Sequence, residues 1–182
     1  MKFTKAIAAA LFVAATSTAF AGGYAAYEYS EETNRATDAE NIKNAVVIGT
    51  KVDATDYSFK TETSQTGFGN GSISSGIELR VKQNFNGFYV GGRLGEKISS
   101  STHFSHYAID AGVKFPLVAG LTGDVGYRYR NAFATSNNYE TQRGHVAVGY
   151  AITKQDAVAV RWSRTYGDEE KDAWRLQYTR SF

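Results

Sequence analysis

A histidine and a serine stand two residues apart in the segment His103-Phe-Ser105. In a strand this spacing puts the imidazole and the hydroxyl on one face, which is a starting arrangement for nucleophilic catalysis by serine. A third group would have to orient the imidazole. Asp110 lies an odd number of residues from His103, so its carboxylate would face the other side of the strand. The sequence therefore favours a polar cluster at a loop-to-strand junction, and we assign no catalytic residue.

The sequence contains few residues that could bind a metal ion. The run Asp168-Glu169-Glu170 could offer carboxylates to a divalent cation, but a charged external loop after Gly167 is the simpler interpretation. The chain has three histidines and no cysteine, and no two histidines share a strand face at ligand spacing. We expect no metal and no cofactor, and we assign His145 to a polar network.

The closing segment, 173–182, alternates between two kinds of side chain. Such alternation predicts a strand that lies between an apolar and a polar environment. Near the end of the chain Arg180 interrupts the apolar face, at a place from which its long side chain could reach a membrane interface. The apolar face carries Trp174, Leu176, Tyr178 and Phe182.

This segment resembles the C-terminal strand of bacterial outer-membrane β-barrels, which ends on Phe preceded by apolar residues at every second position. The segments Asp124-Val-Gly-Tyr-Arg-Tyr129 and Gly87-Phe-Tyr-Val-Gly-Gly92 are similar to strands of small barrels of the porin-like and OmpA/OmpX types. The resemblance covers the mature chain by pattern. It implies an outer-membrane location, contact with outer-membrane lipids and lipopolysaccharide, and recognition of the four apolar residues of the last strand by the barrel assembly machinery.

The first residues predict a secretory signal peptide. A basic start, Met1-Lys-Phe-Thr-Lys5, precedes the apolar run 6–15, and Ala19-Phe-Ala21 offers a small-residue cleavage site. The apolar run is shorter than the roughly 20 residues that a spanning helix needs. We therefore expect a signal peptide over 1–21 and one mature domain over 22–182.

Charge and cysteine content exclude several classes of protein. Without Lys2 and Lys5, the 20 basic residues fall to 18 and balance the 18 acidic ones. A nucleic-acid-binding domain would show a basic excess, so we expect no nucleic-acid partner. The absence of cysteine rules out disulfides and thiolate metal sites.

Ten segments have the alternation of strands, and most are close to the roughly 9–11 residues that a tilted strand needs to cross a bilayer. Short connections alternate with longer polar ones over 32–43, 66–75, 98–103, 131–143 and 166–171, as in outer-membrane barrels. We predict an all-β, closed, antiparallel transmembrane barrel of ten strands, with eight as the alternative if the first or third segment is loop. The segments are 24–31, 44–53, 56–65, 76–84, 88–97, 104–115, 121–130, 145–153, 157–165 and 173–182.

A soluble β-sandwich would also bury one apolar face, but it does not explain the terminal Phe182 or the alternating connections. Aromatic residues on the outward face gather near both ends of the strands, where the two membrane interfaces would lie. Near the short turns these are Tyr57, Phe88, Phe115 and Phe182, and near the loops they are Tyr29, Tyr107, Tyr129, Trp162 and Trp174.

The residues that alternate with the outward-facing ones predict a charged lumen. Its side chains could attract anions, or they could pair and brace a narrow barrel, because buried charges need partners. We favour bracing. The inward set comprises Lys51, Lys60, Arg80, Lys82, Arg93, Lys97, Lys114, Arg128, Arg130, Arg161 and Arg175 against Glu28, Asp53, Glu62, Glu78, Asp110 and Asp124.

These observations predict a structural or narrow porin-like protein with a weak preference for anions. A barrel that binds other surfaces through its external loops is an alternative. The His103 and Ser105 pair also resembles that of barrel lipid A deacylases, in which Asn follows the serine; here His106 follows. That resemblance implies a third function, hydrolysis of a lipid A acyl chain. The oligomeric state is left open.

Overall fold

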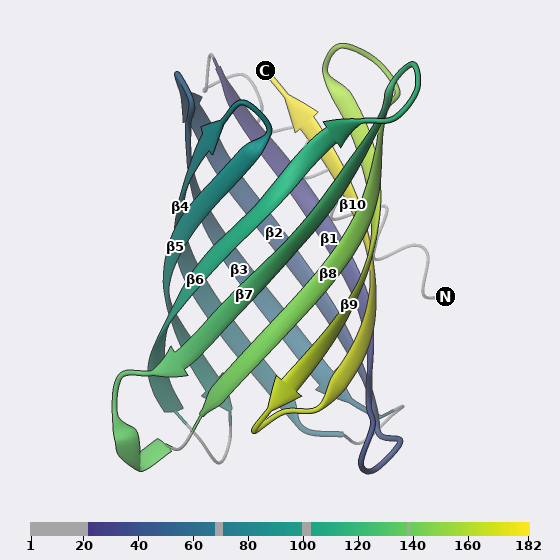
Figure 1. Cartoon of the computed structure of the whole chain (residues 1–182). Coiled ribbons are helices and arrows are strands. Elements are labelled where there is room, and N and C mark those ends of the chain that lie inside the picture. The colour runs from purple at the N-terminus through teal and green to yellow at the C-terminus, as the bar shows by residue number, and fades with distance from the viewer. Residues whose placement is uncertain (1–21, 68–70, 100–102, 138) are drawn as a thin grey trace.

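The computed structural model describes residues 22–67, 71–99, 103–137 and 139–182, so the expected signal peptide lies outside it. Ten antiparallel strands close into a barrel in the order β1-β10-β9-β8-β7-β6-β5-β4-β3-β2 (Figure 1). In the described part of the chain, no helix is long and apolar enough to cross a membrane. The strands are β1 (Gly23–Asn34), β2 (Glu40–Val52), β3 (Thr55–Thr66), β4 (Ile73–Phe85), β5 (Phe88–Ser99), β6 (His103–Pro116), β7 (Leu121–Ala132), β8 (Glu140–Ala151), β9 (Asp156–Gly167) and β10 (Lys171–Ser181), with a 3-10 turn, η2 (Thr135–Asn137), after β7.

The prediction of ten strands is confirmed, and the alternative of eight is wrong. The weakly patterned third segment forms β3, which pairs with β2 and with β4 over nearly its whole length. Its outward side becomes polar after Phe59, yet the ladder continues because each main-chain N–H and C=O still needs a partner.

The two ends of the barrel differ. We call the end at which β1 begins and β10 ends the turn end, and the other the loop end (Figure 1). The long loops predicted at the loop end are wrong in extent, because pairing continues through polar residues there. Thr33 pairs with Glu40, for example, so the connection between β1 and β2 shortens to 35–39.

The apolar residues of this barrel lie mainly on its outside. Large side chains such as Leu79, Ile109 and Leu176 are more than half exposed, whereas the buried residues facing the lumen include Glu28, Lys60 and many other charged or polar groups. The hydrophobic effect therefore cannot be satisfied by the barrel alone, and the apolar outer surface requires lipid or detergent around it.

Glycines opposite aromatic rings shape the lumen wall. Gly112 lies directly across from Tyr89 in the register, and a Cβ on this glycine would fall 2.4 Å from the Tyr89 Oη. Gly49 faces Tyr24 in the same way, with a Cβ placed 2.5 Å from the ring. Each glycine leaves the space into which the ring of the neighbouring strand folds.

The last residue completes the closure between β1 and β10. The Phe182 N–H donates to the Gly23 carbonyl, and the Phe182 carbonyl accepts from the Gly22 N–H, both at 3.0 Å. Arg180, which interrupts the apolar face, lies 3.2 Å from a carboxylate oxygen of Asp156 at the turn end. Its charge is thus held at the rim of the barrel.

Candidate functional site: the charged lumen

Besides Lys51 and Lys97, fourteen of the seventeen charged residues expected in the lumen lie in its interior: each lines a cavity there or forms an ion pair with a residue that does. They do not form one network but several clusters at different heights. The fourteen are Glu28, Lys60, Glu62, Glu78, Arg80, Lys82, Arg93, Asp110, Lys114, Asp124, Arg128, Arg130, Arg161 and Arg175.

Asp53 was expected in the lumen, and this expectation is wrong. It lies after the end of β2 in the tight turn to β3, exposed and with a φ of 53°. Aspartate tolerates the left-handed conformation that such a turn requires, so its role is local. Asp56, which begins the inward face of β3, is the buried carboxylate nearby.

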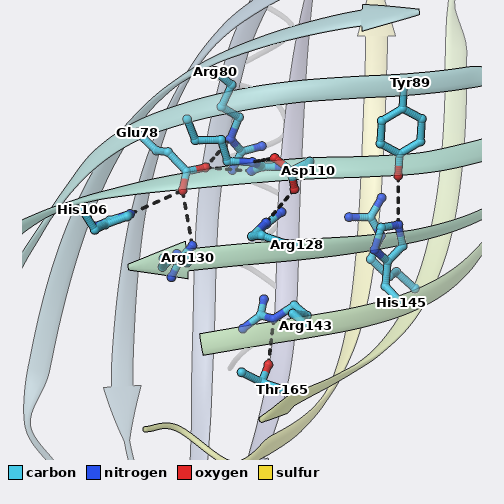
Figure 2. Close-up of polar contacts among 12 residues, drawn as sticks. Glu78, Arg80, Tyr89, His106, Asp110, Arg128, Arg130, Arg143, His145 and Thr165 are labelled. Carbon is cyan, nitrogen blue, oxygen red and sulfur yellow. Dashed lines mark hydrogen bonds and ion pairs between the residues drawn. The ribbon is translucent and has the colours of Figure 1, made fainter. Parts of the chain in front are cut away.

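Glu78 is the centre of the largest cluster (Figure 2). One of its carboxylate oxygens lies 2.5 Å from Arg80 Nε and 2.8 Å from an Arg93 nitrogen, and the other lies 3.4 Å from Arg130. His106 Nε2 stands 3.7 Å from the same carboxylate. The Glu78 side chain is 9% exposed, so removing its charge would leave Arg80 and Arg130 without a carboxylate partner among the described residues in a low-dielectric interior.

Asp110 extends this cluster across β5, β6 and β7. Arg93 forms two hydrogen bonds with its carboxylate, and Arg128 Nε donates to it at 2.7 Å. Arg93 therefore bridges Glu78 and Asp110, with a guanidinium fork that matches carboxylates on both sides. The arrangement fixes four adjacent strands against one another.

A second cluster lies on β1, β3 and β10. The Lys60 ammonium stands 2.8 Å from Glu28 and 2.8 Å from Glu62. Arg175 lies 3.2 Å from Glu28 and donates to the Ser30 hydroxyl at 3.1 Å. Because Lys60 and Glu28 belong to strands that are not neighbours, this pair reaches over β2 inside the barrel.

Sequence reasoning missed the cluster at the loop end. Glu32, whose side chain is 1% exposed, is surrounded by Lys43 at 3.0 Å and by Lys171 and Arg143 at 3.8 Å. Extending the period-2 pattern of the first segment by one more inward position, from Glu28 and Ser30 to Glu32, would have found it.

The loop end of the lumen is also crossed by a bridge from one wall to the opposite one. Lys97 on β5 reaches Glu169, between β9 and β10, at 3.0 Å, and Glu169 lies 2.9 Å from Lys171. Lys97 also lies 5.3 Å from the centre of the Tyr139 ring, and Arg130 donates to the Tyr139 hydroxyl. These contacts tie β5, β7 and β10 together over the lumen.

The Glu169 bridge predicts a dependence on pH. Burial alone would raise the pKa of Glu169, but the ammonium groups of Lys171, Lys97 and Lys43 outweigh it and hold the pKa well below its usual range. The ionised carboxylate therefore contributes stability that is full above the unfolded pKa of about 4.3 and is lost as pH falls through the folded pKa. We expect the wild type to resist urea better than Glu169→Gln near neutral pH, and this difference to shrink at about pH 3. A difference that stays constant with pH would contradict the assignment.

The turn half of the lumen is arranged differently. Tyr24 donates to Asp56 at 2.8 Å. Tyr89 donates to Asp124 at 3.0 Å and contacts His145 Nε2 at 3.3 Å (Figure 2). The sequence assigned His145 to a polar network, and in the structure its contacts are with Tyr89 and Asp124.

Among the described residues, the lumen contains a cavity in each half. The one in the loop half measures about 30 Å³, and its lining includes four basic residues, Lys43, Lys60, Lys97 and Arg130, and three inward-facing acidic ones, Glu62, Glu78 and Glu169. The one in the turn half measures about 360 Å³ and is lined by seven basic and four acidic side chains. In the loop half the charges that line the cavity are paired and the cavity is small, whereas the cavity of the turn half is large and its lining is positive.

The carboxylate missing from the His103 and Ser105 pair is supplied by the neighbouring strand. His103 Nε2 lies 2.5 Å from Glu96, and Glu96 stands directly across from Ser105. The three residues lie on the outer face at the loop end. Among the described residues, however, no hydrogen bond joins the Ser105 hydroxyl to His103.

The run Asp168-Glu169-Glu170 is held by contacts within the protein. Asp168 accepts from the Glu140 N–H at 2.5 Å, Glu169 forms the bridge described above, and Glu170 pairs with Arg35 at 3.5 Å. Within the described residues, no group of three or more His, Cys, Asp or Glu side chains could hold a metal ion.

No family model and no curated protein matches the chain. Solved structures similar to it include the KdgM porin, with a TM-score of 0.53 and 12% identity over 86% of this chain and 99% of that one. The COG4313 outer-membrane channel from Pseudomonas putida F1 gives 0.54 and 11% over 88% and 95%. The β domain of the Bordetella autotransporter BrkA gives 0.50 and 10% over 88% and 99%. At these identities the similarity concerns the fold: this chain has the closed barrel of small outer-membrane proteins.

Proposed function

We propose that this protein resides in the bacterial outer membrane, to which a cleaved signal peptide directs it, as a narrow porin-like barrel with a weak preference for anions. The hollow, positively lined turn half of the lumen is the observation that carries the proposal. Structural similarity to the KdgM porin and to the COG4313 channel supports a porin-like role. With the termini in the periplasm, as in outer-membrane barrels with short periplasmic turns, the turn end is periplasmic.

The loop half limits what could pass. The Glu78 cluster and the bridge from Lys97 to Glu169 place paired charges across it, and the cavity that these residues line measures about 30 Å³ among the described residues. Open aqueous channels belong to barrels of about 16–18 strands, whereas the interiors of small barrels are filled by side chains. The proposed role is therefore closer to a structural barrel than to an open pore.

Electrical recordings test this proposal. Purified protein refolded into planar bilayers is expected to show small or no conductance, and a reversal potential in a salt gradient that favours anions wherever current flows. Lys154→Gln, which removes a basic side chain from an exposed turn outside the lumen, should leave that potential unchanged. Large, cation-selective currents would overturn the proposal.

A second candidate function is hydrolysis of an acyl chain of lipid A. The contact between Glu96 and His103 on the outer face favours it, because a carboxylate that orients the imidazole is the third element of a serine nucleophile site. Ser105 has no hydrogen bond to His103 among the described residues, which is why this candidate ranks second.

Lipid analysis separates the two candidates. If the barrel is a deacylase, overexpression should remove an acyl chain from lipid A, and Ser105→Ala, His103→Ala and Glu96→Gln should each abolish or strongly reduce that loss. Ser75→Ala, a change on an exposed serine of β4, serves as the control. Unmodified lipid A in cells that overexpress the wild type would dispose of this candidate.

A further inference from the structure

The cavity in the turn half contains more positive charge than its own carboxylates neutralise. Arg80 and Arg93 are bonded to Glu78, and Arg175 to Glu28. By contrast, neither Lys51 nor Lys114 has a carboxylate within 4.0 Å among the described residues, although both line the cavity. An uncompensated charge in a concave site is costly unless a counter-ion or water takes the place of a partner.

These lysines form one group at the mouth of the cavity. Lys51 lies next to the end of β2 and Lys114 two residues before the end of β6, and both are exposed, so the cavity reaches solvent at the turn end. Lys82 on β4 lies 3.7 Å from Asp56 and lines the same cavity as Lys51 and Lys114. Three ammonium groups from three different strands therefore share one opening.

Arg161 extends the positive surface inward. Its guanidinium touches Asp124 through a single nitrogen at 3.4 Å, which leaves most of its five N–H donors without a carboxylate. Asp124 is already shared with Tyr89 and His145. A ligand that entered past the lysines would thus meet a further cation with unused donors.

The volume and lining define the kind of ligand. About 360 Å³ is at the lower end of small-molecule sites and corresponds to roughly twelve waters at about 30 Å³ each. Charged side chains dominate the lining, which excludes an apolar ligand. Lysine binds phosphate as a compact point charge, whereas planar carboxylates are better matched by the arginine fork, and the uncompensated groups at the mouth are lysines.

We infer that the turn half of the lumen is a binding site for a small soluble polyphosphate-type anion, held by Lys51, Lys82, Lys114 and Arg161 and entered from the turn end. The site does not require passage through the barrel, because the four cations all line the cavity of the turn half. The inference rests on the proposed function only for the compartment, which makes the ligand periplasmic.

Calorimetric titration of the full-length refolded barrel in detergent with tripolyphosphate tests the site. We expect saturable binding at low salt that weakens as salt screens the charges. The double variant Lys51→Gln/Lys114→Gln should bind about tenfold more weakly, which corresponds to about 1.4 kcal/mol for the two lost charges together. Both side chains are exposed, so the double variant should fold like the wild type. Folding is checked by the shift in gel migration on heating, which both proteins should show.

Lys154→Gln is the matched control, because it removes one lysine from the same end but outside the cavity. It should leave the affinity for tripolyphosphate unchanged. Equal affinities of the wild type and the double variant, or equal weakening by Lys154→Gln, would overturn the site. Tighter binding of citrate than of tripolyphosphate would overturn the phosphate class. Because calorimetry needs no current, the two tests can fail separately: a barrel that carries large, cation-selective currents but binds tripolyphosphate would overturn the proposed function and keep the site.

Discussion

Replacing Glu78 with Gln is expected to destabilise the folded barrel by about 3–5 kcal/mol. The carboxylate is the shared partner of Arg80, Arg93 and Arg130, and a neutral amide of the same shape would leave these buried cations facing one another. The loss should appear as a lower urea concentration at the midpoint of unfolding. Unfolding is followed, for protein refolded into lipid vesicles, by the loss of the gel band whose migration shifts on heating.

Glu170→Gln provides the control for this change. It is the same substitution in an arginine pair, but the Glu170 side chain is 52% exposed and 3.5 Å from Arg35. Exposed pairs contribute about 0–1 kcal/mol, so its midpoint should stay close to that of the wild type. Similar midpoints for the two variants would mean that the lumen is hydrated enough to screen Glu78, and that the bracing interpretation is wrong.

Phe182→Ser is expected to lower the yield of assembled barrel several-fold, and much more than Arg180→Ser. Both residues lie on the outward face of the closing segment, but Phe182 carries the feature shared with the C-terminal strands of outer-membrane barrels. Arg180 is held at the rim by Asp156, a contact of small energetic weight at an exposed site. Fractionation of cells followed by gels of unheated samples measures the yields.

Equal outer-membrane yields of the two variants would contradict the role assigned to the terminal aromatic residue. Refolding the purified variants in detergent adds a second readout. If Phe182→Ser refolds normally in vitro but fails in cells, the defect lies in recognition by the assembly machinery. If it also fails in vitro, the loss is one of barrel stability.

The orientation of side chains could be predicted from sequence because a strand has a strict period of two. Once Ile77, Leu79 and Val81 are placed outward, Glu78, Arg80 and Lys82 must face the lumen, and the structure places them there. The ends of the strands were harder to predict. Polar residues face both the lumen and the solvent beyond the membrane, so the change in composition that marks the end of a segment occurs before the ladder ends.

Partnerships across the lumen could not be predicted, because they depend on register and stagger around the whole barrel. Lys97 and Glu169 are 72 residues apart and meet only when all ten strands have closed. The partner of His103 is nearer, but Glu96 becomes visible only when the register of β5 and β6 is known. The different sizes of the two lumen cavities also depend on register and stagger, and therefore could not be predicted from the sequence.

The unequal pairing of the lumen charges also places different evolutionary constraints on them. At Glu28 and Lys60, which contact each other at 2.8 Å, a change of one residue unbalances the charge of the buried cluster that they form with Glu62 and Arg175, so homologous barrels should exchange the two together. Lys51 and Lys114 have no carboxylate partner within 4.0 Å among the described residues. Each can therefore be replaced independently of other residues, unless binding of a ligand selects for its charge. Covariation at the first pair combined with retained positive charge at the second would therefore distinguish residues kept for the fold from residues kept for a solute.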